Sequence, residues 1–250
     1  MTSVAVIDLN SDLGEGCGDD AALLGIVSSA NIACGAHAGD VHSMRHTVET
    51  ALRNGVSIGA HVSYPDREHF GRRDMTMPSH ALTESILEQL KVLDGIARAA
   101  GTRVRYVKAH GALYNRMADD AGVADTVIAA IKTFDASLAM LTLSGSVAMR
   151  RVQAQGLRAV GEAFADRAYT PAARLVPRVK AGAVIADAAT VARRAVEMVI
   201  NGQVTSLDGI KISIRAHSLC VHGDTPGAVE FARAVRAALE QAGITIRAFA

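Results

Sequence analysis

VAVIDLNSD, residues 4–12, begins as an apolar run and then places a polar residue at every second position. The apolar run predicts a buried strand. Because side chains of an extended segment alternate between its two faces, Asp8, Asn10 and Asp12 share one face. We expect these groups to point into a site at the end of the strand, where carboxylates bind a metal, act as a base or orient a histidine. The competing interpretation is a hydrogen-bonded turn built by Asp12 and Gly14.

Short apolar runs alternate with longer helical patterns along the rest of the chain. The patterns predict helices at residues 43–54, at residues 82–100 and around Val229–Leu239. They predict further strands at residues 56–59, 104–107, 138–143, 156–160 and 211–214, with a short apolar run at 244–246. Repeated strand–helix–strand units imply parallel strands joined by right-handed crossovers.

The positions of the polar residues decide between an open sheet and a closed barrel. An open sheet concentrates its site at one switch point, whereas a barrel gathers functional groups from nearly every strand at one mouth. This chain places polar groups at the ends of most strands: Asn10 and Asp12, then Asn31, His37 and Asp40, then His61, then Lys108 and His110, then Glu162, and finally His217, His222 and Asp224. The sequence therefore predicts one α/β domain over residues 1–250, a TIM-like (β/α) barrel of seven or eight strands.

The composition excludes several classes of protein. Half of the 250 residues are hydrophobic and the formal net charge is +1, so neither nucleic acid nor a membrane surface is an expected partner. No apolar run approaches the roughly 18 residues of a membrane span, and the N-terminus lacks a signal-peptide pattern. Cys17, Cys34 and Cys220 form no CxxC pair, which favours reduced thiols. We expect a cytoplasmic protein, with both a monomer and a homo-oligomer left open.

Lys108 and His110 form the strongest catalytic pair in the chain. They alternate onto one face at the end of a strand, beside Gly111, which permits close approach of a ligand. A lysine in a barrel mouth can stabilise developing negative charge, and a histidine can shuttle protons. Glu162 closes another strand and is expected to face the same mouth.

Two loops carry arginines suited to binding a small anion. Arg67 and Arg72 follow His61 in a loop punctuated by proline and glycine, and Arg167 and Arg178 lie in a loop too long to be a mere connector. Guanidinium groups can hold a carboxylate or phosphate through paired hydrogen bonds. The alternative for the first loop is an ordinary solvated charged surface.

Several other polar residues have two interpretations each. His37 lies among small residues and is the group there best placed to reach a ligand, while Asp40 is equally suited to capping the helix that follows. His42 and His46 have the i, i+4 spacing of a helical metal site, but a solvated face is favoured because no third ligand is near. Asp224 is either a binding group or the cap of the last helix.

Standard signatures of nucleotide-binding folds and serine hydrolases are absent from the sequence. It contains no Walker-type phosphate loop, no Gly-x-Gly-x-x-Gly after a strand, no His-Glu-x-x-His and no Gly-x-Ser-x-Gly. A function in one of those classes therefore loses support.

Taken together, the polar strings resemble the LamB/YcsF family. Each string is weak alone, but their order from residue 8 to residue 227 is specific. Two spacer positions depart from the usual family pattern, Ala36 before the histidine of the second string and Ala109 between Lys108 and His110. The matching strings are Asp8–Asn10 with Asp12–Glu15, Ser29–Gly35 with His37–Asp40, Ile58–His61, Phe70–Arg72, Lys108 with His110–Asn115, Phe164–Arg167 with Leu175–Arg178, and Val221–Asp224.

The resemblance implies a barrel related to the sugar-deacetylase type and hydrolysis of the lactam of 5-oxo-L-proline to L-glutamate, coupled to ATP cleavage. It also implies two partner subunits, B and C, with ATP as a co-substrate and Mg²⁺ as the divalent ion that would accompany it. In this hypothesis Arg72, Arg167 or Arg178 holds the substrate carboxylate or a phosphate.

Under the same hypothesis, Lys108 and His110 steady the developing oxyanion, and Asp12 or Glu162 activates water. The remaining binding candidates are Asn10, His37, Asp40, His61, Arg67, His222 and Asp224. Replacing Lys108 by Ala is expected to abolish ATP-dependent glutamate formation and to leave the fold intact.

Two rival functions remain at this point. A metal-dependent amidase or deacetylase would use Asp12, His37 and His61 as ligands, and its activity would need metal but no ATP. A non-catalytic binding subunit would leave the chemistry to its partners, so single replacements of polar residues such as Asp12, Lys108 and His110 would have no effect in the complex.

Overall fold

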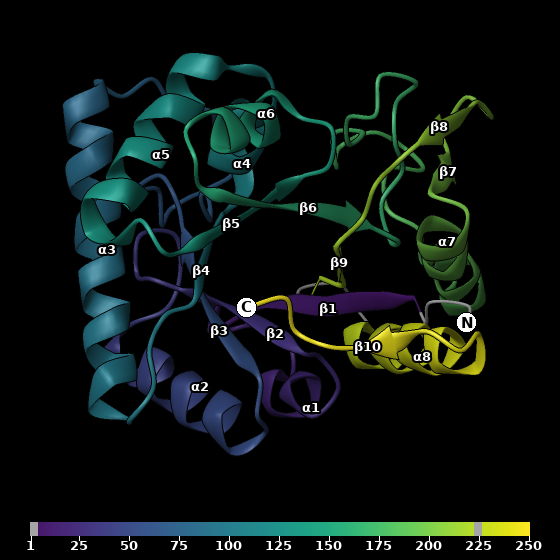
Figure 1. Ribbon diagram of the computed structural model, residues 1–250, viewed down its shortest axis with the longest axis horizontal. Coiled ribbons are helices and arrows are strands. Elements are labelled where there is room, and N and C mark those ends of the chain that lie inside the picture. The colour runs from purple at the N-terminus through teal and green to yellow at the C-terminus, as the bar shows by residue number, and fades with distance from the viewer. Residues whose placement is uncertain (1–4, 223–226) are drawn as a thin grey trace.

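A closed barrel of parallel strands dominates the computed structural model, which describes residues 5–222 and 227–250 (Figure 1). Strand β9 closes the barrel because it pairs with β6 on one side and with β1 on the other. Over the described ranges the barrel has seven strands, which confirms the predicted fold class. They are β1 (Val6–Leu13), β2 (Ser29–Ala33), β3 (Ser57–Val62), β4 (Tyr106–Ala109), β5 (Ala139–Leu143), β6 (Arg158–Phe164) and β9 (Ser218–Cys220).

Helices surround the barrel, with α3 and α5 on one side and α7 and α8 on the other (Figure 1). In α3 the residues at helical spacing, Ile86, Leu90, Leu93 and Ala97, are all fully buried, as their pattern predicts. The helices are α1 (Asp20–Leu24), α2 (Val41–Arg53), α3 (Ser79–Ala99), α4 (Gly111–Asp119), α5 (Ala121–Asp135), α6 (Val147–Ala154), α7 (Ala188–Ile200) and α8 (Ala228–Gln241).

The strand predicted at residues 211–214 forms but lies outside the barrel. It is β8 (Lys211–Ser213), and it pairs antiparallel with β7 (Gln203–Thr205) in a separate two-stranded sheet. The alternation of exposed and buried residues in β8 differs from the fully buried pattern of the barrel strand β9. An alternating pattern is typical of a sheet with one solvated face, which explains why β8 is not a barrel strand.

β1 is longer than its apolar run, and this extension builds the site. The strand predicted at residues 4–7 continues to Leu13, while Val4 lies outside the described residues. Asp12 pairs in register with Asn31 of β2, which in turn is level with Gly59 of β3. Polar side chains therefore occupy the inside of the barrel at its carboxyl half.

Toward the amino ends of the strands, the ring of Tyr106 packs against Gly59 inside the barrel. The ring of Tyr106 occupies the space beside Gly59, where an added Cβ would lie 2.2 Å from the ring. The Tyr106 hydroxyl donates a hydrogen bond to Asn31 Oδ1 at 2.7 Å. Asp8 accepts hydrogen bonds from the hydroxyls of Ser28, Ser29 and Ser218.

The C-terminal segment covers the amino end of the strands. β10 (Thr245–Ile246) pairs with the first residues of β1, and the chain then runs toward the middle of the barrel (Figure 1). There Phe249 packs edge-on against Tyr106, with ring centroids 4.8 Å apart. A membrane-spanning helix, long and apolar enough to cross a bilayer, does not occur among the described residues.

Candidate active site

A cavity of about 470 Å³ opens at the carboxyl ends of the barrel strands. Its floor and walls come from β1, β3, β4, β6, the start of α4 and the loop between β6 and α7. Most of the predicted strand-end residues meet at this end of the barrel. Those that line the cavity, together with the apolar ring of Phe164, are Asp12, His61, Arg72, Lys108, His110, Arg167, Arg178 and His222.

Lys108 lies on the floor of the cavity between two carboxylates. Its Nζ is 2.8 Å from Asp12 Oδ1 and 2.8 Å from Glu162 Oε1, and it also donates to Cys220 Sγ. Burial alone would lower the pKa of Lys108, but the charges of Asp12, Cys220 and Glu162 raise it well above its usual value. Lys108 is therefore a fixed ammonium group at neutral pH.

Asp12 and Glu162 are both held as partners of the Lys108 ammonium group. Burial raises the pKa of Asp12, but the neighbouring His61 and Lys108 outweigh it and lower the pKa well below its ordinary value. Glu162 accepts a hydrogen bond from the Tyr114 hydroxyl at 2.7 Å. A carboxylate with so low a pKa is a weak base, so Asp12 is better suited to orienting its neighbours than to activating water.

Asn10 connects the floor to the rest of the barrel interior. Its Nδ2 donates to Ser218 Oγ at 2.7 Å, and its Oδ1 accepts from Asn31 Nδ2 at 2.7 Å. Asn31 Nδ2 also donates to Asp12 Oδ1. Asn10 is fully buried, its Oδ1 lies 3.4 Å from Lys108 Nζ, and it is not among the residues that line the cavity.

Three histidines gather around the carboxylate of Glu15. Glu15 Oε1 lies 3.0 Å from His37 Nε2, 3.3 Å from His110 Nδ1 and 3.7 Å from His61 Nε2. The rings of His37 and His110 are stacked with centroids 3.8 Å apart. Burial raises the pKa of Glu15, but its polar contacts with His110 and His37 lower it far below its usual range. Burial lowers the pKa of His37 to about 4.

Arginines form the outer wall of the cavity. Arg167 is buried and donates to the carbonyls of Val176 (2.6 Å) and Ala183 (3.3 Å), which fixes the loop that carries it. Burial and the neighbouring charges of Arg178 and Arg72 lower the pKa of Arg167. Three guanidinium groups close enough to perturb one another create a positive potential that suits an anionic ligand.

His222 and Asp166 form a buried pair beside this wall. His222 Nδ1 lies 2.7 Å from Asp166 Oδ2, and the His222 ring stacks on Phe164. Because a carboxylate only accepts hydrogen bonds, Nδ1 carries the proton and Nε2 of the neutral ring is the acceptor. Burial raises the pKa of Asp166, but the neighbouring His222 lowers it overall. This arrangement is suited to general base chemistry.

Some of the predicted binding residues lie outside this cavity. Asp40 accepts a hydrogen bond from Ser43 N and caps α2, so its capping interpretation is the one that forms. Arg67 donates to the carbonyls of Gly35 and Gly39, which holds that loop together. Both residues line a separate cavity of about 340 Å³, with His37. Asp224 lies outside the described residues.

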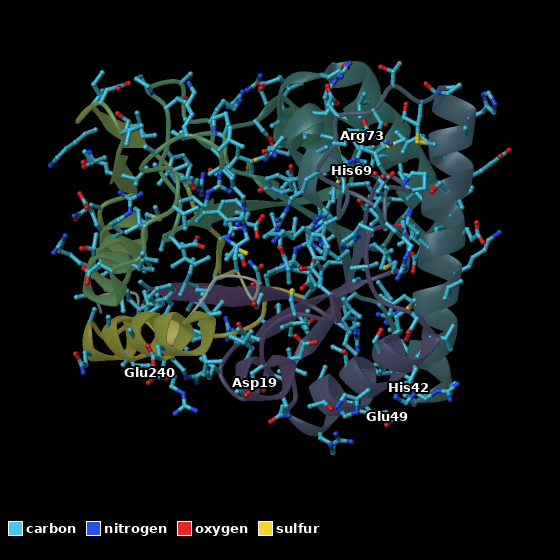
Figure 2. All side chains as sticks on the ribbon, turned by 180° about the vertical axis from the view of Figure 1, so that it is seen from behind. Asp19, His42, Glu49, His69, Arg73 and Glu240 are labelled. Atoms are coloured by element: carbon cyan, nitrogen blue, oxygen red, sulfur yellow. The ribbon has the colours of Figure 1, made fainter. Side chains whose placement is uncertain are left out.

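The pair His42 and His46 is exposed on α2, as its solvated interpretation predicts. Figure 2 places His42 and Glu49 at the periphery of the molecule. The pair therefore lies apart from the histidines inside the barrel.

Glu15 and Asp166 are site residues that periodicity in the sequence does not single out. Strict alternation from Asp12 would put Glu15 on the opposite face, but β1 ends at Leu13 and Gly14 has a φ of +74°, which turns Glu15 back toward the cavity. Asp166 sits two residues beyond the end of β6, where no periodicity applies. Both belong to the strings that carry the family resemblance, and those strings are the signal that could have found them.

Fold and site together define a protein class: a parallel α/β barrel with a charged cavity at the carboxyl ends of its strands, the usual position of active sites in such barrels. The chain belongs to the LamB/YcsF family, whose model matches residues 7–250. The 5-oxoprolinase A subunit of Paracidovorax citrulli is 55% identical over 98% of this chain and 99% of that protein. A 5-oxoprolinase A subunit of Agrobacterium fabrum is 52% identical over 99% of both chains.

Solved structures agree with this assignment. The lactam utilization protein from Thermus thermophilus superimposes with a TM-score of 0.92 at 41% identity, over 98% of this chain and 100% of that one. A deacetylase solved with its substrate has a TM-score of 0.52 at 14% identity, over 98% of this chain and 88% of that one. The second likeness concerns the fold alone, and it confirms the predicted relation to deacetylase-type barrels.

Proposed function

We propose that this chain is the A subunit of a 5-oxoprolinase, which opens the lactam of 5-oxo-L-proline to L-glutamate with coupled ATP cleavage. The observation that carries the proposal is the cavity in which Lys108 lies on the floor and Arg72, Arg167 and Arg178 form the wall. A small, anionic, cyclic amide matches this distribution of charge. The names of the similar 5-oxoprolinase chains and of the lactam utilization protein support the same substrate class.

In the proposed complex the arginines bind the carboxylate of the substrate or a transferred phosphate. The ammonium group of Lys108 stabilises negative charge that develops on the lactam oxygen. Transfer of the γ-phosphoryl group of ATP to that oxygen, with ADP as the leaving group, would make the ring carbon a better electrophile. Mg²⁺ would accompany the ATP. Attack of water on this carbon then breaks the C–N bond, and the ring nitrogen takes up a proton. Release of phosphate by a second water completes the reaction.

We assign the role of water-activating base to His222, oriented by Asp166, in place of Asp12 or Glu162. The low pKa of Asp12 makes it a poor proton acceptor, and Glu162 is bound to Lys108 in an ion pair and is not among the residues that line the cavity. His222 lines the cavity and has its Nδ1 fixed by Asp166. His110 also lines the cavity, but its Nε2 lies 2.9 Å from the Phe70 carbonyl oxygen, so we assign stabilisation of the lactam oxygen to Lys108.

The test is 5-oxoproline-dependent ATP hydrolysis, measured with this chain alone and then with the partner subunits B and C. We expect activity only with the partners, and we expect Arg178→Ala to raise the KM for 5-oxoproline more than it lowers kcat. Arg193→Ala on the exposed face of α7 is the matched control. Full activity of the chain alone would contradict the shared-subunit proposal. Lactam hydrolysis without ATP would favour the metal-dependent amidase.

A non-catalytic role for this chain has its own discriminating result. If Lys108→Met and His222→Ala leave the rate of the assembled complex unchanged, the chain only binds its partners or the substrate. The proposed function predicts that each of these variants loses most of the activity while the complex still assembles.

A further inference from the structure

The rings of His61 and His110 present bare nitrogens to each other. His61 Nδ1 lies 3.2 Å from the carbonyl oxygen of Lys108, and His110 Nε2 lies 2.9 Å from the carbonyl oxygen of Phe70. A carbonyl oxygen only accepts, so both of these ring nitrogens carry the proton. In the neutral rings the other two nitrogens, His61 Nε2 and His110 Nδ1, are then unprotonated, and they lie 3.0 Å apart.

Two lone pairs at this separation repel each other unless a positive charge lies between them. Two carboxylates face these nitrogens, because Glu15 Oε1 is 3.3 Å from His110 Nδ1 and Asp12 Oδ2 is 3.3 Å from His61 Nε2. The Lys108 ammonium contacts the other oxygen of Asp12 and leaves the charge of Glu15 uncompensated by a lysine. All of these residues are buried or nearly so. The cluster therefore has the electrostatic character of a cation site lined by nitrogen and oxygen donors.

The spacing of the donor atoms matches a specific kind of cation. Zn²⁺ binds imidazole nitrogen and carboxylate oxygen at about 2.0–2.1 Å, so tetrahedral ligand atoms stand about 3.3 Å apart. Here Glu15 Oε1 is 3.0 Å from His37 Nε2, 3.3 Å from His110 Nδ1 and 3.7 Å from His61 Nε2. One donor atom from each of these four residues lies within 4.8 Å of all the others.

We propose that Glu15, His37, His61 and His110 form a binding site for one divalent transition-metal ion of the zinc type, on the wall of the active-site cavity. Two backbone carbonyls hold the rings of His61 and His110 in the ligating tautomer, the outer-shell arrangement typical of metal-bound histidines. Glu15, His61 and His110 all line the main cavity, so the ion would face a ligand there.

His37 differs from the other histidines of this site. Its Nδ1 is buried, and within the described residues it has no hydrogen-bond partner, so no outer group fixes its tautomer. We therefore expect His37 to be the weakest of the four ligands. The proposal therefore predicts an order of effects: replacing His37 should weaken metal binding less than replacing His61 or His110. Histidines that only pack together would show no such order.

The experiment measures metal binding directly and needs neither ATP nor the partner subunits. The full chain is stripped with a chelator and titrated with Zn²⁺ by calorimetry, and bound metal is counted after dialysis. We expect one equivalent of Zn²⁺ and a higher melting temperature when it is bound. His61→Gln and His110→Gln should weaken binding by more than the roughly 10–100-fold that is typical of losing an outer-shell partner, and His37→Gln should weaken it less.

The matched control removes two histidines that the site does not contain. The variant His42→Ala/His46→Ala loses the exposed pair on α2 and should bind Zn²⁺ as the wild type does. If the wild type binds no Zn²⁺, or if His61→Gln binds it unchanged, the proposal is wrong. Should the glutamine variants fail to fold, the visible spectrum of the wild type with added Co²⁺ tests the site instead. A tetrahedral site of nitrogen and oxygen ligands gives intense visible absorption, and absence of this absorption would contradict the proposal. This result is independent of the 5-oxoprolinase assay, so either proposal can fail alone.

Discussion

Lys108 shows how one residue serves both stability and the candidate site. Its ammonium group joins Asp12 and Glu162 inside the barrel, and its aliphatic stem and head are almost completely buried. A buried ion pair contributes little net stability when it is intact, but removing one partner leaves the other charges buried without compensation. The expectation that Lys108→Ala leaves the fold intact is therefore revised.

We predict that Lys108→Ala lowers the free energy of unfolding by about 3–5 kcal/mol, in addition to abolishing activity in the complex. Urea unfolding followed by circular dichroism measures the loss. Lys91→Ala, on the exposed side of α3, is the control and should change stability by less than about 0.5 kcal/mol. The double variant Lys108→Met/Glu162→Gln should recover part of the stability, and its failure to do so would argue against the charge explanation.

Asp8 carries a pH dependence that is separate from the cavity. Burial raises its pKa from 3.8 to about 6, against the hydrogen bonds from Ser218, Ser29 and Ser28. A carboxyl whose pKa is higher in the folded state opposes folding above pH 6, and this opposition fades as the pH falls toward 3.8. Asn can accept from the Ser28 and Ser29 hydroxyls and donate to Ser218 without carrying a charge.

We predict that Asp8→Asn is more stable than the wild type at about pH 8, by up to about 3 kcal/mol. The difference should shrink as the pH is lowered from about 6 to about 4, because the wild-type carboxyl then becomes protonated in the folded state. Melting temperatures of both proteins across this range test the prediction. A difference that is independent of pH would point to packing and not to ionisation.

At the scale of elements, the ends of strands and helices decide which residues reach the site. Asp40 and Arg67 are both charged and both line the smaller cavity with His37. The structure nevertheless uses them to hold a helix start and a loop, through Ser43 N for the first and the carbonyls of Gly35 and Gly39 for the second.

Asp40→Ala should lower the free energy of unfolding by about 1 kcal/mol, which is typical of losing an N-cap. Asp40→Ser should keep most of the stability because serine also caps, and both variants should keep the KM for 5-oxoproline in the assembled complex. If both variants lose activity while their stability is unchanged, Asp40 takes part in binding, and the capping explanation is insufficient.

At the scale of the whole molecule, the two ends of the barrel differ in structure: one is a charged cavity and the other is an apolar contact. The carboxyl ends of the strands hold the charged cavity, while the amino ends are covered by the C-terminal segment. Phe249 packs there against Tyr106, in a small cluster with Ala139, Leu141 and Val160.

We predict that Phe249→Ala lowers the free energy of unfolding by about 1–3 kcal/mol, since it removes an aromatic contact and the apolar cover over Tyr106. The effect on kcat and KM in the complex should be small because Phe249 lies at the opposite end of the barrel from the cavity. Chemical unfolding and steady-state kinetics on the same preparation separate the two effects. A large change in KM at unchanged stability would show that Phe249 affects the cavity and would contradict the prediction.

Much of the fold could be predicted from the sequence because its signals are local. Buried strands and the buried face of α3 follow from apolar periodicity, and the barrel follows from polar residues at the ends of most strands. Local signals do not show which strands pair with each other. The 211–214 strand alternates polar and apolar residues where a barrel strand such as β5 is buried throughout, but so short a segment does not reveal its partner, and its pairing with β7 places it outside the barrel.

The sequence by itself determined the α/β barrel, the end of the barrel that holds the polar residues, and membership in the LamB/YcsF family. These follow from alternation, spacing and the order of short strings along the chain. Only the tertiary structure decided which polar groups meet. Lys108 reaches Asp12 and Glu162, and Glu15 reaches three histidines, because β9 closes the barrel between β6 and β1. Contacts between groups so far apart in the chain depend on that closure, and no local pattern encodes them.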